Sequence, residues 1–440
     1  MRIIKRVLLA LLTLVLVAAG ALYLVPLSSY IPRIEQAAAA ALGQPVKVAD
    51  LRLVLLPTPH ATLSGIRIGP GGEVAVDKLS VVPALGSLLS SPRVLRKVEL
   101  EGVAAPADFL PALMPRGEAE GPAAVRVEQV ELKDVKLALA AGPVPAFDAQ
   151  VQLSAAGQPQ HLRAATRDGK LTLEAVPEGD LTRVTARARE WTPPAGVPIR
   201  FDELAAFGEL RRDGLLLKAV EGKLYGGTLA ASTELRWDKG FAANGSITLQ
   251  GVAIEPLLAL FAQSGKMSGR LDTRARFSAV ARDAARLAEV LRADGSFVVR
   301  DGVLHNVDLA QAASLMGGSR TRGGSTRFDE LTGNYHVAGK SYRLERLQVR
   351  SGLLNAQGDV AIAPSRQLDG KVNVELKSGV AWVVVPLRVA GTTQEPVLYP
   401  TGAAVAGAAA GTAVLGPGVG TTLGARVGDA LEGLFGGNKK

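Results

Sequence analysis

Alternation of apolar and polar residues with a period of two dominates the chain from Val46 onward, and this limits most of it to β-strands. Clear examples are residues 125–133, 346–350 and 371–377, where Val or Leu alternates with charged or amide side chains. A strand of this kind has one apolar and one polar face. We therefore predict a mainly β protein whose antiparallel sheet is covered on one side only.

Turn-forming dipeptides recur along this region at intervals typical of hairpins. They are Asp168-Gly169, Asp213-Gly214, Asn244-Gly245, Asp294-Gly295, Asp301-Gly302 and Asp369-Gly370. Helix signals are few and short. A helix of about 11 residues is predicted between Pro32, in its first turn, and Gly43, just past its end, where it could serve simply as a spacer. Further helices are predicted at residues 255–263, 282–293 and 308–316, the last capped by Asp308.

The N-terminus has the pattern of a membrane anchor. Residues 7–25 carry no charge and, as a helix, would reach about 28 Å, close to the hydrocarbon thickness of a bilayer. Arg2, Lys5 and Arg6 precede them, so residues 1–6 are predicted to be cytoplasmic and the bulk of the chain to lie outside the cytoplasm. The alternative is a cleaved signal peptide, although the segment from Pro26 to Tyr30 is a poor cleavage site.

The chain also contains internal similarity. FDEL occurs at residues 201–204 and again at 328–331, followed each time by a similar order of strand and turn signals over about 50 residues. A weaker pair is VELEGV at 98–103 and VELKDV at 130–135. Chance similarity is the alternative, but duplication predicts a sheet extended by stacking of strand units.

These features predict a division of the chain into an N-terminal β region, a C-terminal β region with the internal repeat, and a Gly/Ala-rich tail. The corresponding ranges are 32–200, 201–400 and 401–440. Residues 396–425, which run into the tail, carry no charge, and Gly407 and Gly411 have the small-xxx-small spacing of packed membrane helices. The tail is therefore either a contact with a partner or the outer membrane, or a low-complexity extension.

Composition excludes several classes of function. The chain has no Cys and four scattered His, so thiolate metal sites and thiol nucleophiles are excluded, and we predict no enzyme activity, cofactor or metal. The net charge of +9 arises largely at the two ends, and no basic block with interleaved aromatics occurs inside the chain. We therefore predict no nucleic-acid partner.

Five segments resemble the AsmA family of inner-membrane-anchored proteins of Gram-negative bacteria. Two are N-terminal, Ile34–Gly69 and Val81–Val103, and three are C-terminal, Gly295–Gln311 (GSFVVRDGVLHNVDLAQ), Phe328–Ile362 and Val385–Pro400 (VPLRVAGTTQEPVLYP). The resemblance implies an inner-membrane protein with one span, a cytoplasmic N-terminus and a periplasmic body. It further implies an elongated, twisted β-groove of repeating units that contributes to phospholipid transport and outer-membrane biogenesis.

An apolar sheet face that curls into a trough could hold acyl tails, since each covered methylene contributes about 0.8 kcal/mol. Phospholipids are then the predicted partners, and seven residues are predicted to face them: Phe297, Val299, Leu347, Val349, Val372, Val374 and Leu376. Two alternatives remain open at this point. Two such sheets could close on one another as a sandwich, and the protein could act as an assembly factor or scaffold for outer-membrane proteins.

Overall fold

The computed structural model of the chain divides into two compact units, Met1–Ala188 with Pro193–Gly196, and Arg189–Thr192 with Val197–Lys440. It describes residues 27–54, 58–87, 93–106, 125–139, 142–194, 197–261, 263, 265–314, 320–352, 354–378 and 381–401. The predicted membrane anchor and nearly all of the tail lie outside these ranges. Within them, none of the helices combines the length and apolar character needed to cross a membrane.

The first unit opens with the short helix η1 (Leu27–Tyr30) and the helix α2 (Ile31–Leu42), which confirms the helix predicted between Pro32 and Gly43. Gly43 ends α2 in the left-handed conformation, with a φ of 63°, and its N–H donates to the Ala39 carbonyl. The idea of a simple spacer is wrong, because Ile34 and Leu42 pack against the apolar core of the first strands.

The first unit then continues as a sheet, interrupted by the short helix η2 (Leu85–Ser87). Its strands are β1 (Val46–Lys47), β2 (Asp50–Val54), β3 (His60–Ile68), β4 (Val74–Pro83), β5 (Arg93–Pro106), β6 (Val125–Val127), β7 (Gln129–Leu139), β8 (Gly142–Pro143), β9 (Phe147–Leu153), β10 (Pro159–Thr166), β11 (Leu171–Glu178) and β12 (Leu181–Trp191). Strand β3 pairs with β1, β2 and β4, and the ladder continues from β4 to β5 and from β7 through β9, β10 and β11 to β12.

The prediction of a wholly antiparallel sheet is wrong in this unit, because β5 pairs in parallel with both β6 and β7. The two similar segments VELEGV and VELKDV lie side by side in this parallel pair, with Val98 opposite Val130 and Leu100 opposite Leu132. The connection from Pro106 to Val125 exceeds the dozen or so residues that a parallel crossover needs. The sheet is therefore mixed.

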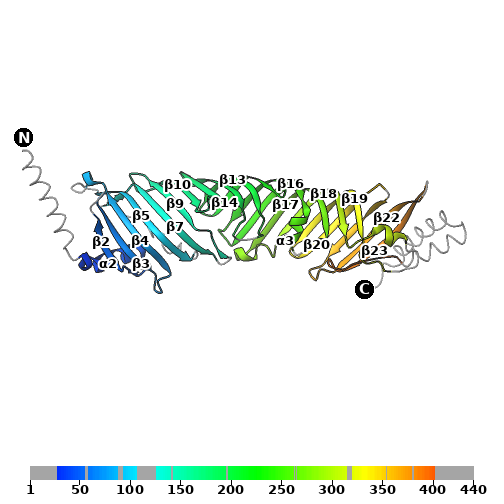
Figure 1. Cartoon of the computed structure of the whole chain (residues 1–440), viewed down its shortest axis with the longest axis horizontal. Helices are drawn as coiled ribbons and strands as arrows, with labels where there is room; N and C mark the ends of the chain where they lie inside the picture. Colours follow the sequence, from blue (N-terminus) through cyan, green and yellow to red (C-terminus); the bar gives the residue numbers. More distant parts are fainter. Residues whose placement is uncertain are drawn as a thin grey trace, which may run out of the picture. The chain divides into compact units, whose positions relative to one another are not determined.

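The second unit has strands that pair antiparallel with their neighbours in chain order, which confirms the predicted pairing here (Figure 1). They are β13 (Phe201–Arg211), β14 (Gly214–Leu224), β15 (Gly227–Arg236), β16 (Phe241–Ala253), β17 (Met267–Ala281), β18 (Arg292–His305), β19 (Ser325–Ala338), β20 (Ser341–Arg350), β21 (Leu354–Ile362), β22 (Leu368–Ser378), β23 (Ala381–Gly391) and β24 (Pro396–Pro400).

Helices in the second unit are short, as expected. They are α3 (Ile254–Leu260), η4 (Ala284–Arg286) and α4 (Leu309–Ser314). Asp308 caps α4 as predicted, since its carboxylate accepts from the Gln311 N–H at 2.8 Å. The helix predicted at residues 282–293 is wrong: only η4 forms there, and β18 begins at Arg292. Val290 is 41% exposed, so a helix there would have had no core against which to bury its apolar face.

Only some of the Asp-Gly and Asn-Gly pairs that were predicted as turns form turns in the structure. Asp168-Gly169 and Asp213-Gly214 lie at the hairpin turns that follow β10 and β13. Three others lie inside strands, at Asn244-Gly245 of β16, Asp294-Gly295 of β18 and Asp369-Gly370 of β22. Asp301-Gly302 is also within β18, where the ladder to β17 shifts register and Asp301 has a φ of 52°.

The two FDEL segments occupy corresponding places in their strand runs. Phe201 begins β13 and Phe328 lies near the start of β19, and both side chains are buried, in two different apolar clusters. A bulge follows each at the same sequence distance, after Leu217 in β14 and after Leu344 in β20. The runs β13–β16 and β19–β22 therefore share strand order, aromatic anchor and bulge.

Candidate functional site: the inner face of the C-terminal unit

One face of strands β17–β24 carries the largest apolar cluster described in the second unit, and we call it the inner face. Strand register builds it as rows. One row runs Val299, Leu331, Val349, Ala356, Val374 and Val385 across β18–β23, each residue opposite the next. A parallel row contains Phe297, Leu347, Gly358, Val372 and Leu387. Period-two alternation places every member of both rows on this one side.

All seven residues predicted to face lipid lie in this cluster. Val299 and Val374 are fully buried and Val349 is 9% exposed. Phe297, Leu347, Val372 and Leu376 are partly buried and pack against the same core. The structure therefore brings the seven together on one face, and their contact with lipid stays a prediction.

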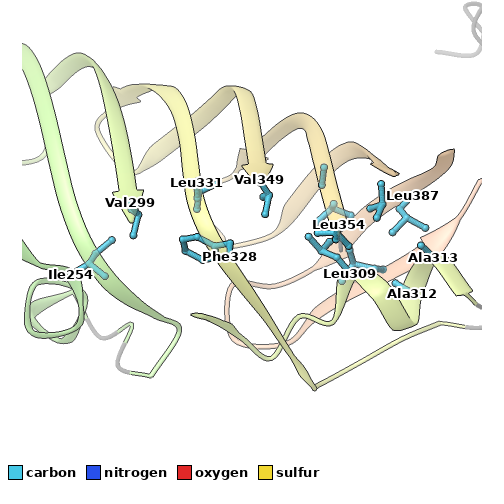
Figure 2. Packing of buried hydrophobic residues seen from close by; sticks show 14 residues of the cluster. Ile254, Val299, Leu309, Ala312, Ala313, Phe328, Leu331, Val349, Leu354 and Leu387 are labelled. Carbon is cyan, nitrogen blue, oxygen red and sulfur yellow. The ribbon is translucent and has the colours of Figure 1, made fainter. Parts of the chain in front are cut away.

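The short helix α4 lies on this face although it connects β18 to β19, and it contacts β22, β23 and β24 as well as β19. In Figure 2, Leu309, Ala312 and Ala313 of α4 lie beside Leu354 and Leu387 of the sheet. Ala312 is fully buried there. The helix therefore fills the part of the inner face that β22–β24 provide.

Hydrogen bonds hold α4 and the segment after it. The buried Thr326 hydroxyl accepts from the Leu309 N–H at 3.0 Å and donates to the Val307 carbonyl at 2.8 Å. Thr321 and Leu398 exchange two backbone hydrogen bonds of 2.8 and 3.2 Å, so the segment before β19 pairs with β24. This end of the inner face is closed by these contacts.

Next to α4 lies a cavity of about 240 Å³ that is lined mainly by apolar side chains. Its lining includes Met267 of β17 and Leu398 of β24, which in a flat sheet would be about 34 Å apart at 4.8 Å per strand. The sheet must therefore curl around the cavity. Phe297, Leu347, Val349 and Val372 are lining residues that were predicted from sequence; residues missed include Met267, Leu304, Leu344, Val360, Leu368 and Leu398.

The sequence pattern identifies the missed residues only weakly. Leu344 and Leu347 are three positions apart, which breaks the alternation, and they face the same cavity because a bulge lies between them. Only the knowledge of that bulge would have placed both on one side.

Aromatic rings cover glycines on the same face. An added Cβ at Gly333 would lie 2.8 Å from Leu347 Cδ2 and 3.0 Å from Phe297 Cε1, so both side chains pack directly on its backbone. The rings of Phe297 and Tyr335 are 6.3 Å apart. The Tyr335 hydroxyl lies 3.0 Å from that of Thr273, which donates to the Ser296 carbonyl at 2.8 Å. Phe297 therefore packs on the Gly333 backbone and beside the Tyr335 ring.

The opposite, outer face is charged. Asp272, Arg300, Glu330 and Arg350 form successive ion pairs across β17–β20. The pKa of Asp272 is lowered, first by the hydrogen bond from the Gly251 N–H and then by Arg300. The sheet is therefore polar on one side and apolar on the other, as the alternation predicts.

The histidines form no obvious site. His336 lies on the outer face, with Nδ1 2.5 Å from Asp294 and Nε2 3.5 Å from Glu345. Among the residues that the structure describes, no group of three or more His, Asp or Glu side chains is placed to hold a metal ion.

The family model that matches the chain is that of the AsmA family, and it matches residues 200–339. This region of the chain is AsmA-like. The match covers β13–β19, including the first FDEL segment, the second one and the strand before α4. It confirms the resemblance that the sequence motifs predicted. No curated protein and no solved structure matched the chain.

Proposed function

We propose that this AsmA-family protein is a β-groove protein that binds phospholipid acyl chains on its inner face and contributes to phospholipid transport and outer-membrane biogenesis. The carrying observation is the one-sided sheet: the inner face is apolar over β17–β24, and the described residues place no second sheet upon it. Residues 7–25 would anchor the chain in the inner membrane, with its body in the periplasm.

Physical chemistry supports lipid as the ligand. An apolar sheet face left open to water costs free energy, and acyl chains that cover it gain about 0.8 kcal/mol for each methylene removed from water. Half-buried side chains such as Leu347 and Val372 offer surface to such a chain, whereas the outer face is occupied by ion pairs. Lipid head groups would remain at the wet edge of the sheet. No catalytic step is needed for this role.

A pair of adjacent positions tests the proposal. Leu347 is half-buried on the inner face and its neighbour Gln348 is exposed on the outer face. A photocrosslinking amino acid at 347, in the full chain in cells, is expected to capture phospholipid, and the same group at 348 is expected to capture little. Val374 is a poorer position, because it is fully buried and a bulky group there would disturb the core.

The outcomes separate the candidate functions. Capture of phospholipid at 347 but not at 348 supports the groove. Crosslinks at 347 to protein alone would contradict it and favour a closed sandwich or an assembly factor. Alkaline carbonate extraction tests the anchor separately, since a protein released from the membrane by this treatment has no inserted helix.

A further inference from the structure

The inner face ends at the cavity beside α4, and this distinguishes the cavity from the rest of that face. Phe297, Leu347 and Val372 line the cavity and belong to the apolar rows of the inner face. Helix α4 is packed on β22–β24, and the hydrogen bonds between Thr321 and Leu398 close the sheet edge. A chain that lies along the inner face would therefore reach a blind end at this cavity.

The lining selects the chemistry of what can enter. The lining side chains are apolar except for Gln357 and for Thr326, whose hydroxyl already pairs with Leu309 and Val307, so water would find few of the two to four hydrogen-bond partners that it needs. Apolar cavities of about 150 Å³ stay dry and bind benzene or xenon, and this one has about 240 Å³. A charged or hydroxylated group would lose its hydration there without replacement. A lining of this kind suits a hydrocarbon.

The size limits how much of a ligand can enter. Pockets that enclose a whole small-molecule ligand usually have about 300–1,000 Å³, and this cavity is smaller. It can hold the end of one chain, while the remainder of the molecule lies outside on the inner face. We infer that the cavity is a terminal pocket for the methyl end of a single acyl chain and that α4 is the stop against which this chain ends. This inference rests on the proposed function.

A second occupant has to be distinguished. The chain continues past β24, whose residues Pro396 and Leu398 line the cavity, into an uncharged segment rich in Gly and Ala. That segment offers mainly small side chains and a polar backbone, which the apolar lining could not satisfy with hydrogen bonds. The lining therefore favours an acyl chain over the protein's own tail.

Crosslinking with position-specific lipids tests this. The full chain is reconstituted in phosphatidylethanolamine vesicles that contain a trace of the same lipid with a diazirine either at the methyl end or next to the carboxyl carbon of its acyl chain. After irradiation, mass spectrometry locates the adducts. The methyl-end probe is expected to label cavity residues such as Met267 and Leu344, and the carboxyl-end probe is expected to label the inner face outside the cavity.

Two neighbouring substitutions supply the matched pair. Val360→Phe fills the cavity, whereas Ala361→Phe adds the same ring to the exposed outer face of the same strand. Val360→Phe is expected to lower methyl-end labelling of Met267 and Leu344 about tenfold, which corresponds to about 1.4 kcal/mol. Ala361→Phe is expected to leave it unchanged. The wild-type labelling pattern is a test that does not depend on how either variant folds.

The outcomes distinguish this inference from the proposed function. Labelling of the inner face by both probes, with none in the cavity, would overturn the terminal pocket and leave the groove intact. Absence of lipid adducts anywhere on the inner face would overturn both. A photocrosslinking residue at position 344 that captures residues 402–440 of the same chain, in place of lipid, would assign the cavity to the tail and refute the inference.

Discussion

The open and the packed parts of the inner face should respond differently to the same truncation. Leu387 is fully buried in the cluster at the α4 end, whereas Leu347 is half-buried and lines the cavity. Leu387→Ala removes buried carbons and leaves a closed void, so we expect a loss of about 3–5 kcal/mol in the free energy of unfolding. Leu347→Ala enlarges a space that already exists, so mainly the partial transfer term is lost, about 1 kcal/mol.

Thermal and urea unfolding followed by circular dichroism measure both effects. For a unit of about 150–250 residues, each kcal/mol shifts Tm by roughly 2–4 °C. Leu387→Ala should therefore lower the Tm of the second unit by roughly 10 °C, and Leu347→Ala by about 3 °C. The urea m-value should stay unchanged in both variants, since neither alters the surface exposed on unfolding by much.

Lipid capture should show the reverse order. Leu347→Ala removes part of the wall that a chain would cover, whereas Leu387→Ala acts on packing behind α4. Equal losses of stability for the two variants would refute the reasoning, because Leu347 would then be packed as tightly as Leu387. The inner face would in that case be closed along its length, as in a sandwich.

Three further substitutions test separate parts of the structure. The pKa of Glu99 is lowered to about 2, chiefly by its hydrogen bond from Lys133. Its charge therefore stabilises the fold above pH 4.5, and that contribution is lost as the pH falls toward 2. In the Glu99→Gln variant, the midpoint of urea unfolding should depend less on pH over this range. Thr326→Val leaves the Leu309 N–H and the Val307 carbonyl unpaired, which should cost about 1–3 kcal/mol and speed amide exchange in α4. Gly295→Ala places a Cβ 2.6 Å from the Tyr335 ring, and such overpacking should cost about 1–3 kcal/mol in urea unfolding.

Each of these substitutions has a matched control. Glu101→Gln, on the same strand as Glu99, should retain the acid dependence. Ser325→Ala, beside Thr326 but exposed, should leave exchange in α4 unchanged. Gly352→Ala, where an added Cβ meets no atom within 4 Å, should leave stability within about 0.5 kcal/mol. If a control matches its test variant, the contact named for that variant is not the cause.

Local patterns predicted the elements whose stability is decided locally. Pro32 and Gly43 mark the two ends of α2, because the proline ring and the left-handed conformation of Gly43 each act within one helical turn. Alternation at residues 346–350 and 371–377 predicted β20 and β22, and it placed the candidate groove residues on one face. In these two strands, the order of polar and apolar residues alone predicts which side chains share a face.

Features that depend on partners distant in the chain were missed. The parallel pairing of β5 with β7 depends on which edge a strand returns to, and alternation is the same in parallel and antiparallel ladders. The stretch at residues 282–293 has helical periodicity, but Val290 of its apolar face is exposed and only η4 forms there. The cavity was missed because α4 and a bulge in β20 define it, and neither leaves a period-two signal.

The dipeptides that were misread as turns explain how the two faces of the sheet differ. Inside a strand, the two residues of Asp-Gly point to opposite sides. Asp294 bonds His336 on the outer face, while Gly295 leaves room for the Tyr335 ring on the inner face.

Asn244-Gly245 repeats this arrangement. Asn244 lies 3.4 Å from the Glu234 carboxylate, and the Phe277 ring packs where a Cβ of residue 245 would be. In both pairs the polar residue lies on the outer face, and the glycine leaves room for an aromatic ring of the neighbouring strand on the inner face. An Asp-Gly or Asn-Gly pair opposite an aromatic residue therefore indicates which side of this sheet is polar and which is apolar. Such a pair can be told from a turn because the alternation of apolar and polar residues continues through it without a break.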